Sequence, residues 1–305
     1  MPVVALLLLA IENLKLILLI CSLFYLCQTS CKSSKGFFRC RFFSQNPNPV
    51  PIPWLNPTLP GIFPATKTAA RSPNGLLAAG GALTSEWLIS AYRQGIFPWF
   101  NEGEPPLWWS PTPRLVLFAG EAQANARLLR TLRSCDWQFS TNVDFAGVLQ
   151  GCAAPRDEAG TWLTYALQSA LIELHGLGYA HSLEVFDKNQ RIAGIYGIAI
   201  GKIFFAESMF GSRSNASKAA LLSLSTGLAQ LGFVLMDCQV RSAHLMARGA
   251  REISRTAFEA ILAKATQQSC DWPEIWPIAD TRALALALAQ GPAPAQGTAP
   301  APAKA

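Results

Sequence analysis

Charged side chains are scarce in this sequence. Lys, Arg, Asp and Glu make up 14% of its 305 residues, whereas hydrophobic residues make up 50%. Soluble domains carry about 25% charged residues, so this composition excludes an intrinsically disordered chain and supplies ample side chains for a buried core. The length allows one large domain or two ordinary ones. The formal net charge of +6 still points to a polyanionic partner, such as a nucleic acid or an anionic membrane.

The ligands and loops of common cofactor sites are also missing. The sequence holds three histidines without metal-ligand spacing and no C-x-x-C pair, so we expect no bound metal. It also lacks the phosphate-binding loop G-x-x-x-x-G-K-[ST], the dinucleotide loop G-x-G-x-x-G and the hydrolase motif G-x-S-x-G. We therefore expect no cofactor, and we expect the eight cysteines to stay reduced in the cytoplasm.

Residues 1–49 differ in composition from the remainder. They carry a net charge of +4, which leaves only +2 for residues 50–305. Their apolar run at 16–27 has 12 residues, fewer than the ~20 that span a bilayer. A signal peptide has a positively charged segment before its apolar stretch, whereas no Lys or Arg precedes the first apolar stretch here. We therefore expect residues 1–49 to be a leader absent from the mature protein, with translation starting at Val50. A membrane anchor or a cleaved signal is the alternative.

The pattern of residues 50–280 predicts an α+β protein with two domains. Residues 50–113, rich in Pro, Gly and Trp, are expected to form a small N-terminal domain with one helix at 84–94, capped by Thr84. Residues 114–280 are expected to form the larger domain. Apolar periodicity predicts its helices at 122–133, 164–177, 216–231 and 255–266, and its strands at 182–186, 192–200, 203–208 and 233–240. Residues 281–305 are expected to be a helical end followed by a disordered tail rich in Ala and Pro.

The expected strand at 233–240 carries the most informative polar residues. Alternation along a strand places Asp237 and Gln239 on one face and Cys238 on the other. On that face Asp237 can orient Gln239 or hold a substrate ammonium group, and a purely structural pairing with nearby backbone is the alternative. Cys238 is expected in the core, which disfavours a cysteine nucleophile paired with His244.

Three other features have both a structural and a functional interpretation. Glu207 interrupts the apolar strand at 203–208, so it needs either a structural partner or a cationic ligand. Trp99 and Trp162 are either core residues or aromatic platforms for unpaired bases. Three arginines at i, i+3 and i+6 of one expected helix form either a solvated stripe or one that follows nucleic-acid phosphates; these are Arg127, Arg130 and Arg133.

Eight motifs occur in order along the chain and carry a family resemblance. They are P-N-G-L-L-A-A-G-G (73–81), A-Y-R-Q-G-I-F-P-W-F (91–100), L-W-W-S-P-T-P-R (107–114), G-T-W-L-T (160–164), H-S-L-E-V (181–185), A-E-S-M-F (206–210), N-A-S-K (215–218) and D-C-Q-V (237–240). Together they closely resemble the bacterial leucyl/phenylalanyl-tRNA–protein transferases over residues 52–278. Two positions depart from the family pattern: Ala82 replaces an Asp common after the Gly-Gly pair, and Leu224 stands where some members carry an aromatic residue.

The resemblance implies an activity and a fold. The family transfers Leu or Phe, less often Met, from aminoacyl-tRNA to the N-terminal Arg or Lys of an acceptor protein, and the new peptide bond marks the acceptor for N-end rule degradation. The implied fold is a small N-terminal domain plus a larger N-acyltransferase-like domain related to the acetyltransferases, with the boundary near Pro113. An acyl-CoA-dependent acetyltransferase is the rival within that fold, but the sequence has no pyrophosphate-binding R/Q-x-x-G-x-G/A loop. A membrane-anchored binding protein that uses residues 1–27 is a second rival.

The resemblance also implies roles for individual residues. It gives Gln239 a proton-relay role with Asp237 orienting it; because a neutral amide is a poor base, we expect orientation and electrostatic stabilisation instead. It places Glu207 beside the aminoacyl group and the arginine stripe against the acceptor stem of the tRNA. It places the terminal adenosine on Trp99 and Trp162. The apolar pocket for the amino-acid side chain is expected from Ile195, Phe204, Met209, Leu221, Leu224 and Met236.

Overall fold

The computed structural model describes residues 52–154 and 162–290. Every helix and strand named below belongs to the unit Trp54–Ala305. The predictions of a leader at 1–49 and of a tail at 291–305 fall outside the described residues.

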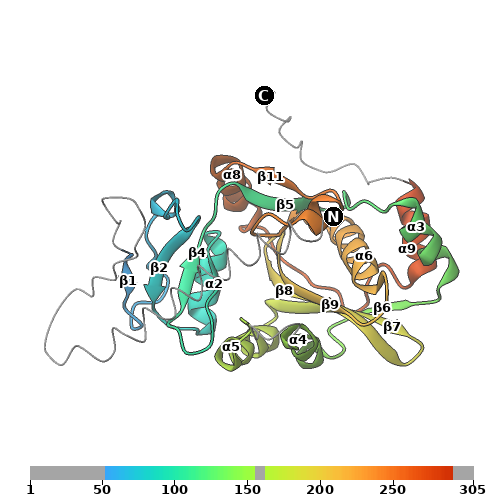
Figure 1. The fold of residues 1–305 in the computed structure, drawn as a ribbon, viewed down its shortest axis with the longest axis horizontal. Helices are drawn as coiled ribbons and strands as arrows, with labels where there is room; N and C mark the ends of the chain where they lie inside the picture. The colour runs from blue at the N-terminus through green and yellow to red at the C-terminus, as the bar shows by residue number, and fades with distance from the viewer. Residues whose placement is uncertain (1–51, 155–161, 291–305) are drawn as a thin grey trace, which may run out of the picture. The chain divides into compact units, whose positions relative to one another are not determined.

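The first part of the described chain forms a four-stranded sheet in the order β1-β2-β4-β3 (Figure 1). The helices and strands of this part of the chain are β1 (Trp54–Leu55), the 3₁₀ helix η1 (Thr66–Thr68), β2 (Leu76–Gly80), α2 (Ser85–Arg93), β3 (Phe97–Pro98) and β4 (Leu107–Trp109). The prediction of a helix at 84–94 is confirmed. The Thr84 hydroxyl accepts a hydrogen bond from the backbone N–H of Trp87, and Gly95 follows the helix with a φ of +71°.

A seven-stranded sheet follows, in the order β11-β5-β10-β9-β8-β7-β6. Its strands are β5 (Arg114–Phe118), β6 (Gln138–Thr141), β7 (Ala180–Asp187), β8 (Gln190–Ile200), β9 (Ile203–Gly211), β10 (Leu235–Asp237) and β11 (Arg251–Ile253). Strands β6 to β9 pair antiparallel, whereas β9 and β10 run parallel. A parallel pair needs a crossover connection, which α6 (Ala216–Gln230) supplies.

Helices cover both faces of the seven-stranded sheet (Figure 1). On one face lie α4 (Phe145–Ala153) and α5 (Tyr165–Gly176), and on the other lie α6, α3 (Ala126–Ser134) and α9 (Thr281–Gln290). The remaining helices are α7 (Ala243–Met246) and α8 (Arg255–Ala265). The described part of the chain is therefore a mixed α and β protein.

The predicted helices are largely confirmed. Helices α5, α6 and α8 agree with the predictions to within two residues at each end, and α9 confirms the helical end that begins at 281. Helix α3 begins later than predicted because Asn125 is its N-cap, accepting a hydrogen bond from the backbone N–H of Leu128 at 2.9 Å. Helix α4 and strands β5, β6 and β11 were not predicted from the sequence.

Strand alternation divides the interior into two cores, one on each face of the large sheet. Along β8, Tyr196 and Ile198 belong to the core under α4 and α5, which we call the α4-side core. Ile195 and Ala199 belong to the core under α6, which we call the α6-side core. Both faces of the central strands are thus apolar, which explains why their sequences are nearly continuous hydrophobic runs. None of the helices within the described residues combines the length and the apolar character that crossing a membrane demands.

Candidate active site

Strands β9 and β10 separate in the middle of the large sheet. Their parallel pairing covers three residue pairs and ends where Asp237 pairs with Phe205. Further along β9, the ladder with β8 skips Glu207, so that this residue is the extra one of a β-bulge. Gly197 of β8 lies opposite the bulge, where an added Cβ would come within 2.2 Å of the carbonyl oxygen of Phe205. The bulge therefore depends on glycine at position 197, and it takes Glu207 out of the regular ladder.

The strand predicted at 233–240 is too long, and this changes how Gln239 is placed. Strand β10 covers only Leu235–Asp237, and Gln239 follows it with a φ of +64°, in the left-handed region. Contrary to the prediction, hydrogen bonds and not strand alternation orient its side chain. The backbone N–H of Gln239 donates to Asp237 Oδ1 at 2.9 Å, and its Nε2 donates to Glu207 Oε1 at 2.7 Å. Gln239 thus bridges the diverging strands β10 and β9.

Asp237 is held by a buried arginine that the sequence analysis missed. Arg114, the first residue of β5, donates from Nε to Asp237 Oδ1 at 2.8 Å and from Nη2 to Oδ2 at 2.6 Å. Only 1% and 0% of the two side chains are exposed, and the guanidinium lies 4.9 and 4.8 Å from the ring centroids of Phe97 and Phe258. The signal that could have revealed it is the charge at the head of the apolar run R-L-V-L-F, since a buried charge needs a partner. Asp237 is therefore an ion-paired residue that orients Gln239 through its backbone.

Glu207 has neutral hydrogen-bond partners. Besides the amide of Gln239, it accepts a hydrogen bond from the hydroxyl of Tyr92, a buried residue of α2. It forms no ion pair with another described residue. Burial raises the pKa of Glu207 to about 8; the charge of Asp237 acts in the same direction, and the two hydrogen bonds oppose it. Although the residue as a whole is partly exposed, its carboxyl group is buried, and this burial is the largest cause of the unusually high pKa.

The six residues expected to form the amino-acid pocket lie together in the α6-side core. Ile195, Phe204, Leu221, Leu224 and Met236 are no more than 2% exposed, and Met209 packs against them partly buried. Two of the six, Phe204 and Met236, are register partners in β9 and β10, one pair before these strands separate. The structure therefore brings the predicted pocket residues together beside the separation, as close-packed side chains.

Cys238 is a core residue, as its position in the sequence predicted. It is 7% exposed and belongs to the α6-side core, on the face opposite Asp237. Burial raises the pKa of its thiol, whereas a nucleophilic cysteine needs a lowered pKa. His244 is exposed on α7. These observations disfavour the cysteine-nucleophile interpretation. Within residues 52–154 and 162–290, no three His, Cys, Asp or Glu side chains are grouped as the ligands of a metal ion.

Comparison with known proteins assigns the family. Residues 81–112 match the leucyl/phenylalanyl-tRNA protein transferase N-terminal domain, and residues 116–263 match the leucyl/phenylalanyl-tRNA protein transferase family itself. The leucyl/phenylalanyl-tRNA–protein transferase of Pseudomonas fluorescens (strain Pf0-1) is 50% identical over 207 residues, which are 68% of this chain and 92% of the relative. The leucyl/phenylalanyl-tRNA–protein transferase of Nitrosomonas europaea is 52% identical over 197 residues, which are 64% of this chain and 84% of the relative. The chain belongs to the leucyl/phenylalanyl-tRNA–protein transferase family.

The family matches contain most of the hydrogen-bonded network. Tyr92 lies within the match to the N-terminal domain of the transferase, and Glu207, Asp237 and Gln239 lie within the match to the larger part. Arg114 lies between the two matched stretches. The resemblance drawn from the eight motifs is therefore confirmed at the level of the family. The residue roles and the domain boundary near position 113 stay predictions.

The two tryptophans expected to hold the terminal adenosine are not members of the core that holds the predicted pocket residues of the transferase. Trp99 is 38% exposed, and its ring lies 5.7 Å from that of Trp109. Trp162 is partly buried and packs against the α4-side core. Neither belongs to the α6-side core. Trp99 therefore has a ring surface open to a ligand, whereas Trp162 also has a packing role.

The arginine stripe of the transferase lies on the outer face of α3. Arg127, Arg130 and Arg133 are exposed, whereas Leu128 and Leu132 of the same helix are buried in the α6-side core. Within the part of the chain that the structure describes, none of the three arginines forms an ion pair. Their charges are thus available to an anionic partner.

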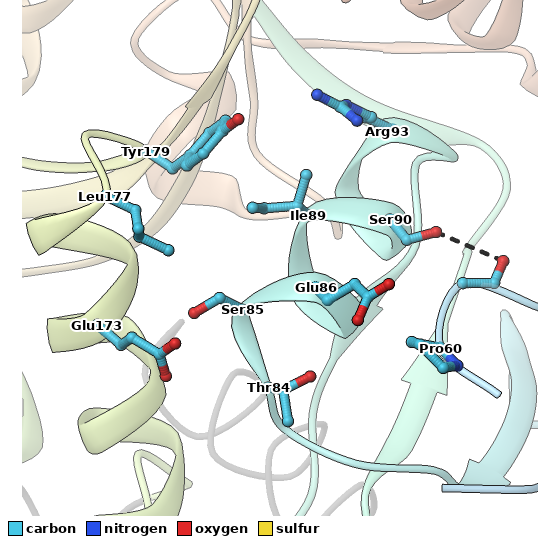
Figure 2. A pocket seen from close by; sticks show the side chains of 11 residues that line it. Pro60, Thr84, Ser85, Glu86, Ile89, Ser90, Arg93, Glu173, Leu177 and Tyr179 are labelled. Carbon is cyan, nitrogen blue, oxygen red and sulfur yellow. Dashed lines mark hydrogen bonds between the residues drawn. The ribbon is translucent and has the colours of Figure 1, made fainter. Parts of the chain in front are cut away.

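An open groove of about 770 Å³ lies between α2 and α5, away from the predicted site (Figure 2). Ser85 and Ile89 of α2 face Glu173 of α5 and Leu177, which follows that helix, across it. None of the residues predicted for the transferase site lines this groove. The candidate active site is therefore the network around Gln239 with the neighbouring close-packed side chains, and not this groove.

Proposed function

We propose that the protein transfers leucine or phenylalanine, less often methionine, from aminoacyl-tRNA to the N-terminal Arg or Lys of an acceptor protein. The family assignment supports the aminoacyltransferase reaction. The new peptide bond marks the acceptor for degradation by the N-end rule pathway in the cytoplasm. The donor and acceptor amino acids follow from the family resemblance.

The proposed reaction needs little chemical activation from the protein. An aminoacyl ester is already activated, so the transfer requires no ATP, metal ion or covalent nucleophile. The attacking α-amine has an ordinary pKa of about 7.7–8.0, so a modest acceptor can take its proton. Holding the amine against the ester supplies much of the rate acceleration, because it converts a bimolecular encounter into a reaction between bound groups.

The bridge that Gln239 makes between Glu207 and Asp237 is the observation that carries the proposal. Because the Nε2 of Gln239 donates to Glu207, its amide oxygen is the group left to accept a hydrogen bond from the attacking amine. Asp237 fixes the backbone of Gln239 and is itself fixed by Arg114. We therefore assign Gln239 to orienting the amine and Asp237 to orienting Gln239.

The pocket residues support an apolar donor side chain. A Leu or Phe side chain buried against the cluster around Phe204 and Met236 gains about 1.5–3 kcal/mol, whereas a polar side chain buried there loses its hydration. Trp99 and Trp162 are proposed to contact the terminal adenosine, and the arginine stripe of α3 is proposed to contact phosphates of the acceptor stem. Phosphate contacts carry no sequence information, which suits an enzyme that accepts several tRNAs.

We also propose that the larger part of the chain has the N-acyltransferase-like fold. The parallel β9–α6–β10 unit and the separation of these two strands at Phe205 and Asp237 support it. The rival function within that fold is acetyl transfer from acetyl-CoA. An assay with each donor separates the two functions.

The test mixes the purified full chain with tRNA carrying labelled leucine and a peptide that begins with Arg. We expect label on the peptide, and no label on a matched peptide that begins with Asp. Acetyl-CoA in place of the tRNA should give no product. Absence of leucine transfer by the folded protein would overturn the proposal. Asp237→Ala should lower turnover far more than tRNA binding, and an equal loss of both would make Asp237 a binding or structural residue.

A further inference from the structure

Two carboxylates contact Gln239, and their surroundings differ. The oxygens of Asp237 are occupied by the bidentate Arg114 and by the backbone N–H of Gln239. Its negative charge is therefore balanced within the protein, and its proton-accepting capacity is taken up. Among the described residues, the groups that donate hydrogen bonds to Glu207 are neutral: the amide of Gln239 and the hydroxyl of Tyr92. Of the two carboxylates, Glu207 is the one whose cationic partner is not among the described residues.

We propose that Glu207 accepts the proton of the acceptor's α-amine, and that Tyr92 is a positioning residue for its carboxyl group. This inference rests on the proposed transfer of an amino acid to a protein N-terminus. It gives the proton to a group other than Gln239, whose neutral amide is a poor base and whose Nε2 is already engaged with Glu207. The hydrogen bond of Gln239 to Glu207 would then place the amine near both groups.

The charged and titratable groups around Glu207 fit this role. Those that face it are Tyr92 of α2, Tyr196 of β8, Asp237 of β10 and Arg114 of β5. Burial raises the pKa of both tyrosines, so each keeps its proton. Burial raises the pKa of Glu207 to about 8, within the range of about 7.7–8.0 for an α-amine. Its carboxylate is therefore a better proton acceptor than that of an ordinary glutamate.

The proton balance of the step is complete. The ammonium group of the acceptor gives one proton to the Glu207 carboxylate and becomes a neutral amine. The amine nitrogen forms a bond to the carbonyl carbon of the ester, and the bond from this carbon to the ribose oxygen breaks. The second proton that the nitrogen loses in becoming an amide goes to the departing ribose oxygen, which leaves as a hydroxyl. Glu207 then releases its proton to solvent.

The test is the pH dependence of turnover at saturating acceptor peptide. Turnover should rise with pH as Glu207 loses its proton in the bound complex. Tyr92→Phe removes a hydrogen bond that favours the charged carboxylate of Glu207. The rising limb of the curve of turnover against pH should therefore lie at a pH higher by on the order of one unit. Tyr196→Phe is the matched control, because Tyr196 is equally buried and its hydroxyl has no hydrogen-bond partner among the described residues. Its rising limb should stay in place.

Glu207→Gln completes the experiment. This variant should lower turnover by about 10²–10⁴-fold, with a smaller change in the KM for the acceptor and with loss of the rising limb. A raised KM with unchanged turnover and pH profile would overturn the proposal, because Glu207 would then only bind the ammonium group. Equal shifts in Tyr92→Phe and Tyr196→Phe would overturn the positioning role. If the wild-type protein transfers no leucine, the proposed function fails; if it does and the variants keep its pH profile, the inference alone fails.

Discussion

Replacing Arg114 by methionine tests the buried ion pair that holds Asp237. Both side chains are almost fully buried, and the two hydrogen bonds that join them measure 2.8 and 2.6 Å. Removing one partner of a buried ion pair costs about 3–5 kcal/mol, because the remaining charge is left without a counter-charge in the protein interior. At about 2–4 °C per kcal/mol for a protein of this size, the midpoint of thermal unfolding should fall by about 6–20 °C. We expect transfer activity to fall as well, since Asp237 fixes the backbone of Gln239.

Calorimetry and urea unfolding at neutral pH measure the effect. The control is Arg282→Met, since Arg282 pairs with Asp136 at the surface, with 71% and 73% of the two side chains exposed. That substitution should cost no more than about 1 kcal/mol. The double variant Arg114→Met/Asp237→Leu should recover much of the stability lost in Arg114→Met, because two apolar side chains replace the ion pair, while activity stays low. If Arg114→Met loses no more stability than Arg282→Met, the reasoning is refuted. A double variant that is less stable than Arg114→Met would refute it as well.

Three other predictions concern the bulge, the arginine stripe and a buried histidine. Gly197→Ala should cost about 1–3 kcal/mol of stability and lower transfer activity, because the new Cβ would lie 2.2 Å from the Phe205 carbonyl oxygen and force β9 to shift. Arg130→Ala should weaken the binding of several aminoacyl-tRNAs alike and reduce the slope of log affinity against log salt by roughly one. Stability should fall as the pH is lowered from about 6.5 toward 4, because burial lowers the pKa of His181 to about 4 and only the unfolded chain takes up a proton in that range. His181→Phe should reduce this dependence in urea unfolding.

Each of these predictions has an outcome that contradicts it. Gly176→Ala is the control for Gly197→Ala, since an added Cβ at position 176 has no atom within 4 Å. Equal losses of stability in the two variants would contradict a steric clash at position 197. Selective loss of one tRNA in Arg130→Ala would contradict phosphate contact. An unchanged acid dependence in His181→Phe would assign the proton uptake to another group.

The secondary structure could be predicted where local signals are strong. Thr84 and Gly95 mark the ends of α2, and apolar periodicity marks α5, α6 and α8. The periodic signal failed for the strand at 233–240, because a left-handed residue at 239 breaks the strand after Asp237. Nothing in the local sequence F-V-L-M-D-C-Q-V distinguishes that turn from a continued strand. Its end depends on pairing with β5 and β9, which are far away in the chain.

The composition of the candidate site could be predicted only in part. Glu207, Asp237 and Gln239 were singled out from the sequence as polar residues within apolar runs, and the structure brings them into one hydrogen-bonded chain. Arg114 and Tyr92 were missed because each acts through a partner more than 100 residues away. Burial of a polar residue is visible in sequence as an exception to a pattern, whereas the identity of its partner is not.

The sequence by itself determined the family, most of the helices and central strands, and the polar residues that interrupt their apolar patterns, because helix caps, periodicity and ordered motifs are local properties of the chain. Only the tertiary structure decided which of the two carboxylates has its negative charge balanced by a buried arginine and which does not. Asp237 and Glu207 are alike in chemistry, and their difference comes from Arg114 at the start of β5 and Tyr92 on α2. A charge is stabilised or destabilised by what the fold packs against it, so the division of roles between the two acids follows from long-range contacts and not from their own neighbours in sequence.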